Sequence, residues 1–181
     1  EDLIRPSDEV NAIVSLIEQR LRVKLALFLN QGVRIRMLGR DRELPESLRT
    51  EFQKEMEMTA GCDDLTVYLA VNYGGRQEII DAALRVAEAL RRGELQTEQV
   101  DERLFGEYLY APDVPDPELL VRTGGELRVS NFLLWQIAYS EMWVTPTLWP
   151  ALTAEEFYCA LADYQSRERR FGGLNGNGTA G

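Results

Sequence analysis

Helix-like and strand-like segments alternate along this chain, and the alternation limits the folds that it can adopt. Amphipathic runs at helical spacing cover residues 7–30, 45–59, 76–92, 97–105, 130–140 and 153–168. Short runs rich in β-formers cover residues 33–38, 65–71, 118–122 and 142–144. This order predicts an α/β fold with a mostly parallel central sheet and helices on both faces.

The length of 181 residues is that of one typical domain. We therefore expect a single domain over residues 1–173. Residues 174–181 are rich in glycine and predict a flexible tail. The tail matches the G-x-G-x-x-G pattern, but it follows no strand and opens no helix, so it is not a dinucleotide site. The sequence has no run of about 20 apolar residues that would span a membrane.

The charge balance excludes several function classes. The net charge of −10 argues against nucleic-acid binding, which depends on a basic surface. The chain has no histidine, so it contains no Ser-His-Asp triad and no metal site with histidine ligands. Its cations are almost all arginines, which suit bidentate contact with phosphate or carboxylate groups.

The loop after the third predicted strand carries the strongest candidate site. In open parallel sheets, ligands bind beyond the carboxyl ends of the strands. Arg122 and Arg128 flank a Gly-Gly turn there, and Ser130 then opens the predicted helix 130–140. Two guanidinium groups and the unpaired N–H groups of a helix start suit a phosphate or diphosphate. In the alternative interpretation, Ser130 only caps the helix and the arginines form surface ion pairs.

Two carboxylates near this loop have open roles. Glu126, inside the loop, either orients the arginines or is a solvated charge. Glu141 follows the predicted helix, and beside a diphosphate it could ligate Mg²⁺, which takes one or two carboxylates plus phosphate oxygens. The alternative for Glu141 is a solvated glutamate at a helix end.

The long run from Asp116 to Glu141 resembles the cis-prenyltransferases, the isoprenyl transferases typified by bacterial undecaprenyl diphosphate synthase. Its core reads Arg122-Thr-Gly-Gly-Glu-Leu-Arg128-Val-Ser130-Asn131-Phe. Three more segments agree in order and spacing: Arg5-Pro6, Asn72-Tyr-Gly-Gly-Arg76 and Arg167-Glu-Arg-Arg-Phe-Gly-Gly173. The resemblance covers nearly the whole chain up to the tail.

The resemblance implies an enzyme that condenses isopentenyl diphosphate with an allylic diphosphate such as farnesyl diphosphate. It implies Mg²⁺ as cofactor, a homodimer and a polyprenyl diphosphate product, such as the undecaprenyl carrier lipid of cell-wall synthesis. A cytoplasmic enzyme with peripheral contact at the inner face of the plasma membrane is expected, because its product is a lipid.

The resemblance also assigns roles to residues. Arg122, Arg128 and Ser130 match positions that hold isopentenyl diphosphate, and Val129 is predicted to bind substrate with them. Glu141 matches a Mg²⁺ ligand. The family's C-terminal Arg-x-Gly element, which reaches the diphosphate across a dimer, corresponds to Arg170 and Gly172.

The first residues align with a segment of the family, but Asp2 and Leu3 differ from the residues that are usual there. Arg5 matches an arginine near the allylic substrate, and Glu1 and Leu3 are predicted to bind substrate beside it. Asp2 stands where the family usually has an asparagine assigned to proton removal, so Asp2 is the candidate catalytic residue. Leu3 stands where a substrate-facing tryptophan is usual.

The family also has an N-terminal segment with a strand and an Asp-Gly-Asn-Gly-Arg loop that these 181 residues do not contain. We therefore expect this chain to be inactive or unstable by itself. The alternative function is that of a non-catalytic partner subunit of a heteromeric cis-prenyltransferase. Mg²⁺-dependent binding of isopentenyl diphosphate distinguishes the two.

Overall fold

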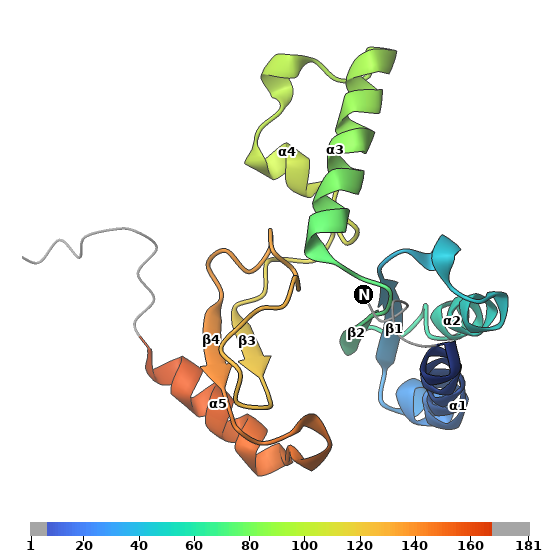
Figure 1. Cartoon of the computed structure of the whole chain (residues 1–181), viewed down its shortest axis with the longest axis vertical. Coiled ribbons are helices and arrows are strands. Elements are labelled where there is room, and N and C mark those ends of the chain that lie inside the picture. The colour runs from blue at the N-terminus through green and yellow to red at the C-terminus, as the bar shows by residue number, and fades with distance from the viewer. Residues whose placement is uncertain (1–6, 168–181) are drawn as a thin grey trace, which may run out of the picture. The chain divides into compact units, whose positions relative to one another are not determined.

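The computed structural model describes residues 7–167, with side chains from residue 10 onward. The chain divides into two compact units, residues 1–114 and 115–181, and each is described by itself (Figure 1). The helices of unit 1 are α1 (Ser7–Asn30), α2 (Glu46–Met58), α3 (Gly75–Arg92) and α4 (Glu102–Gly106), and its strands are β1 (Val33–Leu38) and β2 (Leu65–Ala70). Unit 2 contains β3 (Leu119–Arg122), β4 (Glu141–Val144) and α5 (Ala154–Ser166).

Strands β1 and β2 form a parallel pair, in register from Val33 opposite Leu65 to Leu38 opposite Ala70. The end of α2 is tied to β1 through the buried side chain of Thr59. Its hydroxyl donates to the carbonyl of Glu55 at 2.7 Å and accepts from the amide of Ile35 at 3.0 Å. This link fixes where the helix ends relative to the strand.

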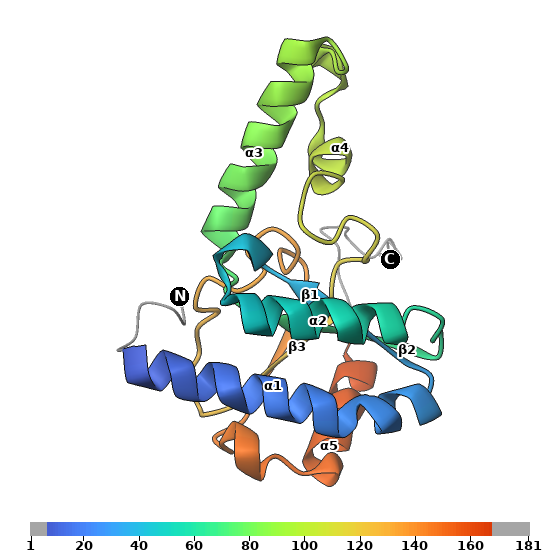
Figure 2. The same ribbon diagram turned by 90° about the vertical axis from the view of Figure 1, so that its right-hand side faces the viewer.

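Helices α1 and α2 lie side by side along this strand pair (Figure 2). Their apolar side chains form the main core of unit 1, because each helix has apolar residues at helical spacing. The buried members are Leu21, Leu44, Leu48 and Phe52, with Met37, Leu69 and Val71 from the strand side packed against them. A smaller cluster of Val86, Ala89 and Leu95 joins α3 to the segment that contains α4.

Helix α3 ends as its sequence predicts. Gly93 takes a left-handed conformation with φ of 72°, and its amide donates to the last carbonyls of the helix. The predicted helix over residues 97–105 is instead divided into a 3₁₀ turn, Thr97–Gln99, and the short α4. Asp101 separates the two and caps α4 by accepting from the amide of Leu104 at 2.7 Å.

Strands β3 and β4 of unit 2 are also parallel, with Leu119 opposite Glu141 and Arg122 opposite Val144. Helix α5 is capped by Thr153, whose hydroxyl accepts from the amide of Glu156 at 3.2 Å. The carboxylate of Glu156 accepts from the hydroxyl of Thr145, just beyond β4, and so anchors α5 to that strand.

The predicted helix over residues 130–140 is wrong: this segment is a series of turns. Ser130, Asn131 and Leu133 have φ values of 47°, 61° and 46°, which a right-handed helix does not contain. None of residues 130–140 is buried. A helix of this length gains most of its stability from burying an apolar face, and the apolar side chains here are half-buried or exposed.

The α/β fold class with parallel strands is confirmed. The four strands of the described residues form two two-stranded sheets, one in each unit. Within residues 7–167, no helix is long and apolar enough to cross a membrane.

Candidate functional site

The loop after β3 is held against the residues that follow β4. The amide of Thr145 donates to the carbonyl of Arg122 at 2.9 Å and so extends the strand pair by one bond. Gly124 and Gly125 then donate to the carbonyls of Thr147 and Thr145 at 2.9 and 2.8 Å. Both glycines have positive φ, 88° and 73°, so the turn needs residues without a Cβ. The Gly-Gly motif therefore sets the course of the loop that carries the arginines.

Arg122 and Arg128 converge on one carboxylate. Nη2 of Arg122 lies 2.9 Å from Oε2 of Glu126, and Nη2 of Arg128 contacts the same oxygen. The hydrogen bond from Arg122 is the main reason why the pKa of Glu126 is below its usual range. The two guanidinium groups thus meet around a single anionic oxygen. This is the geometry in which Glu126 orients the arginines.

The residues after Arg128 depart from the predicted arrangement. Ser130 opens no helix, so the helix N-terminus expected beside the arginines is absent from the described structure. A single turn replaces it, in which the amide of Phe132 donates to the carbonyl of Val129 at 3.0 Å. Val129 and Ser130 follow Arg128 in this turn, so the candidate anion site of unit 2 consists of its arginines, without a helix N-terminus.

Glu141 lies at the other end of the strand pair from Arg122. It opens β4 opposite Leu119, three residues or about 10 Å along the strands from the Arg122 position. Its Oε2 accepts from Nη1 of Arg167 at 2.8 Å, and both side chains are half-buried. Arg167 also donates to Asp163, and its hydrogen bonds to the two acids, that to Glu141 first, raise the pKa of Arg167. The structure does not bring Glu141 together with Arg122 and Arg128.

The described residues contain no group of three or more Asp, Glu or Cys side chains that could hold a metal ion. Mg²⁺ retains several waters and often uses one or two carboxylates together with substrate phosphates. Glu141 fits that role as a single ligand, although one of its oxygens is engaged by a guanidinium.

In unit 1, the loops after β1 and β2 are joined by a network around Arg40. Its Nε and Nη2 bind the two oxygens of Asp81 at 2.9 and 2.6 Å, and its Nη1 lies 2.9 Å from Oε1 of Glu43. Asn72 donates to Oε2 of Glu43 and to the carbonyl of Arg40, at 3.0 and 3.3 Å. Tyr110 completes the network by donating to Asp81.

These contacts shift the ionisation of the groups. The bonds from Arg40 hold the pKa of Asp81 well below its usual range, and the same pairing raises the pKa of Arg40. Burial, aided by the bond to Asp81, raises the pKa of Tyr110 to about 12. Both groups are therefore charged near neutral pH, and their pairing holds the loop after β1 against α3.

The Asn72-Tyr-Gly-Gly-Arg76 turn is fixed by a second buried carboxylate. Glu78 is fully buried, and it accepts from the Tyr73 hydroxyl at 2.5 Å and from the Tyr110 amide at 2.9 Å. The rings of Tyr73 and Tyr110 meet edge to face with centroids 6.1 Å apart. These contacts fix the shape of the turn that connects β2 to α3.

An apolar pocket of about 80 Å³ lies between α1, α2 and the end of β2. Its walls come from both helices and from the residues that end the strand. They are Val10, Ile13, Val14, Ile17, Leu44, Leu48, Ala70, Val71 and Asn72. Such a lining accepts hydrocarbon, since the only polar side chain is that of Asn72 at the strand end.

Two sets of predicted site residues lie outside residues 7–167: Glu1, Asp2, Leu3 and Arg5 at the start, and Arg170 and Gly172 near the end. Asp81 and Tyr110, which bind Arg40 and one another, are not among the residues predicted from the sequence. Polar residues recur at four-residue spacing on α3, at Gln77, Asp81 and Arg85, and so lie on one face of the helix. On that face Gln77 donates to Asp81, and the guanidinium of Arg85 lies over the ring of Tyr110. That spacing was the available signal.

Comparison with known proteins identifies the family. The family Prenyltransf, described as "Putative undecaprenyl diphosphate synthase", matches residues 1–172. The chain belongs to this family. The isoprenyl transferases of Heliobacterium mobile and Thermotoga maritima are 48% and 44% identical to it, over 96% of this chain in both cases. The chain covers 67% and 74% of those proteins, so it spans about two thirds of the length of the curated relatives.

Solved structures of the prenyltransferase family agree. A lavandulyl diphosphate synthase from Lavandula x intermedia, solved with dimethylallyl diphosphate, has a TM-score of 0.90 at 32% identity, covering 93% of this chain and 73% of that one. A probable undecaprenyl diphosphate synthase from Campylobacter jejuni has a TM-score of 0.84 at 37% identity, covering 95% and 78%. The prediction of a cis-prenyltransferase, and hence of a prenyl-transferring enzyme, is confirmed.

Proposed function

We propose that this chain is the part of a cis-polyprenyl diphosphate synthase that holds isopentenyl diphosphate. The observation that carries the proposal is the convergence of Arg122 and Arg128 on one anionic oxygen of Glu126. A diphosphate has several such oxygens and more charge than a carboxylate, so it can replace Glu126 between the same two guanidinium groups. Val129 and Ser130 would then contact the bound substrate.

The proposed reaction joins isopentenyl diphosphate to an allylic diphosphate such as farnesyl diphosphate. The bond from the allylic carbon to its diphosphate breaks, a carbon–carbon bond forms, and a proton leaves the isopentenyl unit. Cationic side chains favour this step because they stabilise charge on the diphosphates. Mg²⁺, when bound, neutralises further diphosphate charge, and Glu141 is the described residue that would hold it. Asp2 is proposed as the group that accepts the proton, with Glu1, Leu3 and Arg5 near the allylic substrate.

The growing prenyl chain needs an apolar environment. The pocket between α1 and α2 supports this part of the proposal, because nearly all of its walls are aliphatic. Its lining includes Ile13 and Ile17 of α1 and Leu48 of α2. We propose undecaprenyl diphosphate or a related polyprenyl diphosphate as the product of the intact enzyme.

Exposed apolar side chains in unit 2 favour an assembly. Leu127, Tyr139, Trp149 and Tyr158 are each more than 60% exposed and are available for contact with a partner chain. We propose a homodimer, with Arg170 and Gly172 serving the partner's diphosphate site. Residues 1–173 are proposed to act as one domain in it, and peripheral membrane contact would come through the lipid product.

Calorimetric titration with isopentenyl diphosphate in the presence of Mg²⁺ tests the proposal. Arg122→Gln is expected to weaken binding at least about tenfold, since a charge-assisted hydrogen bond is lost. The matched control is Arg103→Gln, which removes an arginine that is 79% exposed in its side chain and paired with Glu107 in unit 1. Equal affinities for wild type and Arg122→Gln would contradict the proposal. Failure of the wild type to bind would instead favour the non-catalytic subunit.

The isolated 181-residue chain is expected to make no cis-polyprenyl product from farnesyl and isopentenyl diphosphates. Radiolabelled isopentenyl diphosphate and thin-layer separation of the lipids measure this directly. Formation of a labelled polyprenyl product would show that the chain is catalytically sufficient.

A further inference from the structure

Five arginines are half-buried in the structure, and they differ in how their charge is compensated. Arg40, Arg122 and Arg167 each form a salt bridge. Within residues 7–167, Arg34 and Arg36 of β1 form none. A half-buried guanidinium without an acid is costly, because it has lost part of its hydration and gained no counter-charge. The exception is notable in a chain with 30 acidic and 20 basic residues.

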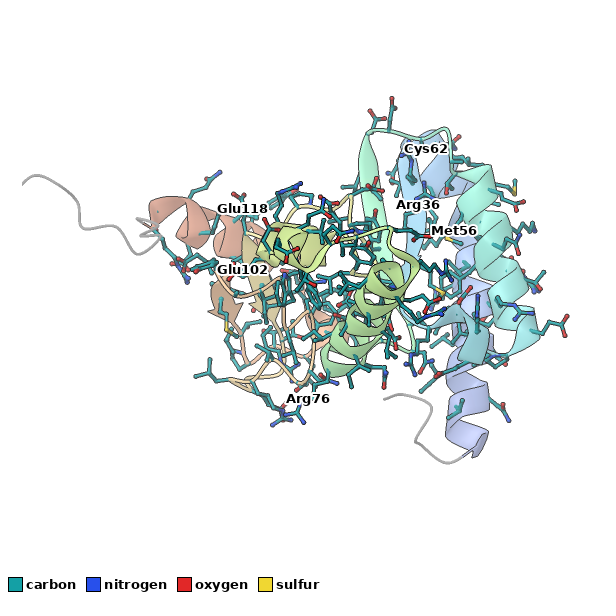
Figure 3. The ribbon with its side chains drawn as sticks, turned by 90° about the horizontal axis from the view of Figure 1, so that it is seen from above. Arg36, Met56, Cys62, Arg76, Glu102 and Glu118 are labelled. Atoms are coloured by element: carbon teal, nitrogen blue, oxygen red, sulfur yellow. The ribbon has the colours of Figure 1, made fainter. Side chains whose placement is uncertain are left out.

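The two uncompensated arginines share one cleft. Arg34 and Arg36 are two residues apart on β1, so their side chains leave the same face of the strand about 7 Å apart. The cleft has a volume of about 530 Å³, which is within the range of small-molecule sites. Its other walls include Met56 of α2, Thr66 and Tyr68 of β2, and the turn at residues 110–113. Figure 3 labels Arg36 of β1 and Met56 of α2, two of the residues that line this cleft.

The walls of the cleft are fixed by existing bonds. Nε of Arg34 donates to the carbonyl of Cys62 at 2.7 Å, which orients its guanidinium and leaves the terminal nitrogens for another acceptor. Tyr110 is held by Asp81 through its hydroxyl and by Glu78 through its amide. A ligand would therefore meet a cleft that is largely preorganised, which lowers the entropic cost of binding.

The charges in the lining favour an anion. Arg34 and Arg36 contribute two positive charges, and Asp113 is the acidic residue of the lining. We propose that this cleft binds a phosphate-bearing small molecule, with its phosphate oxygens between Arg34 and Arg36. Tyr68 and Met56 would contact the rest of the ligand. This site belongs to unit 1 and uses none of the residues proposed to hold isopentenyl diphosphate.

Nuclear magnetic resonance titration of the ¹⁵N-labelled chain with inorganic diphosphate tests the proposal. Saturable shifts of the Arg34 and Arg36 Nε–Hε signals are expected. Arg36→Gln should weaken binding, so that the dissociation constant reported by the Arg34 signals rises about tenfold or more. Thr66→Glu, which places a carboxylate opposite Arg34, should abolish the Arg34 response. Arg103→Gln should change nothing.

The same titration separates this proposal from the proposed function. Arg122→Gln should leave the response of Arg34 intact and remove only the response of the unit 2 loop. Inorganic phosphate and malonate serve as further probes. If malonate shifts the Arg34 signals as much as diphosphate does, the ligand class is carboxylate rather than phosphate, and the proposal is overturned. Absence of any saturable Arg34 response in a folded wild-type chain would also overturn it.

Discussion

Two arginine clusters, one around Arg40 in unit 1 and one around Arg122 in unit 2, use their charge in opposite ways. In unit 1, Arg40 is locked to both oxygens of Asp81, and Tyr110 closes the network over them. In unit 2, Arg122 and Arg128 share a single oxygen of Glu126, on a loop where Glu126 and Arg128 are largely exposed. The first arrangement satisfies each charge completely and suits a structural role. The second leaves Arg128 and Glu126 exposed, and we propose that a diphosphate replaces Glu126 there.

The two units also differ in how many apolar side chains they bury. Twelve of the thirteen buried apolar residues of the described chain lie in unit 1, and Ala160 is the exception in unit 2. Unit 1 therefore provides most of the folding free energy of the described structure. Unit 2, which buries fewer apolar side chains, contains the candidate loop with Arg122 and Arg128. The stability of unit 2 is expected to depend more on bound ligands and partner chains than that of unit 1.

The largest effect should come from the core of unit 1. Phe52→Ala removes a side chain that is 1% exposed, and it is expected to lower the free energy of unfolding by about 3–5 kcal/mol. Leu127→Ala in unit 2, where the side chain is 81% exposed, should change it by less than about 0.5 kcal/mol. Urea unfolding followed by circular dichroism measures both. If Phe52→Ala does not fold, Phe52→Leu should lower the free energy of unfolding by a smaller amount. Equal changes in the free energy of unfolding at positions 52 and 127 would contradict the difference in packing between the two units.

The Arg40–Asp81 pair should give the next largest effect. Asp81→Asn is expected to lower the melting temperature by several degrees at pH 7, because Arg40 loses its bidentate partner. The pKa of Asp81 is lower in the folded than in the unfolded chain, where it is about 3.9. The stabilisation is therefore present above pH 4 and is lost as the pH falls toward the folded value. Thermal melts from pH 7 to pH 2 should show the two proteins converging in acid, and a constant difference would contradict the role of the carboxylate.

A smaller effect, of opposite sign, is expected at Glu55. Glu55 is fully buried on α2, and neither of its oxygens has a hydrogen-bond partner within the described structure. Burial, followed by the nearby charge of Glu51, raises its pKa. Ionised Glu55 thus destabilises the fold at neutral pH, and stability should increase as the pH falls through its raised pKa.

Glu55→Gln is expected to stabilise the chain by about 1 kcal/mol at pH 7 and to remove that pH dependence. The matched control is Glu57→Gln, an exposed glutamate on the same helix. Unfolding by urea at pH 5 and pH 7 provides the comparison. A destabilised Glu55→Gln variant would indicate that the carboxylate has a partner in solution.

The smallest effect on stability should come from the unit 2 ion pairs. Glu126→Gln breaks contacts to Arg122 and Arg128 at an exposed loop, where ion pairs contribute little. Its melting temperature should equal that of wild type within error. A clear loss would mean that these arginines serve the fold, as Arg40 does, and the contrast between the units would not hold.

The sequence predicted the regular elements of unit 1 well, because their signals are local. The spacing of Leu21 and its neighbours indicated α1, and Gly93 marked the end of α3. The segment from Ser130 to Ser140 has equally strong apolar spacing, yet it forms turns, because helix formation there depends on packing that spacing cannot reveal.

The candidate site was only partly predictable. Gly124, Gly125 and the two arginines lie within seven residues, so the loop could be identified from the sequence. The Arg40–Asp81 pair joins residues 41 positions apart, and no local pattern indicates it. The separation of Glu141 from Arg122 likewise follows from the register of β3 and β4, which the sequence does not specify.

Hydrogen–deuterium exchange of the chain, with and without isopentenyl diphosphate and Mg²⁺, tests most directly whether unit 2 holds the substrate. Residues 122–131 are expected to gain protection on binding, and Arg122→Gln is expected to abolish this gain. The core of unit 1 around Leu48 and Phe52 should exchange slowly in both states. Unchanged exchange over residues 122–131, at a ligand concentration where calorimetry detects binding, would show that this loop does not hold the substrate.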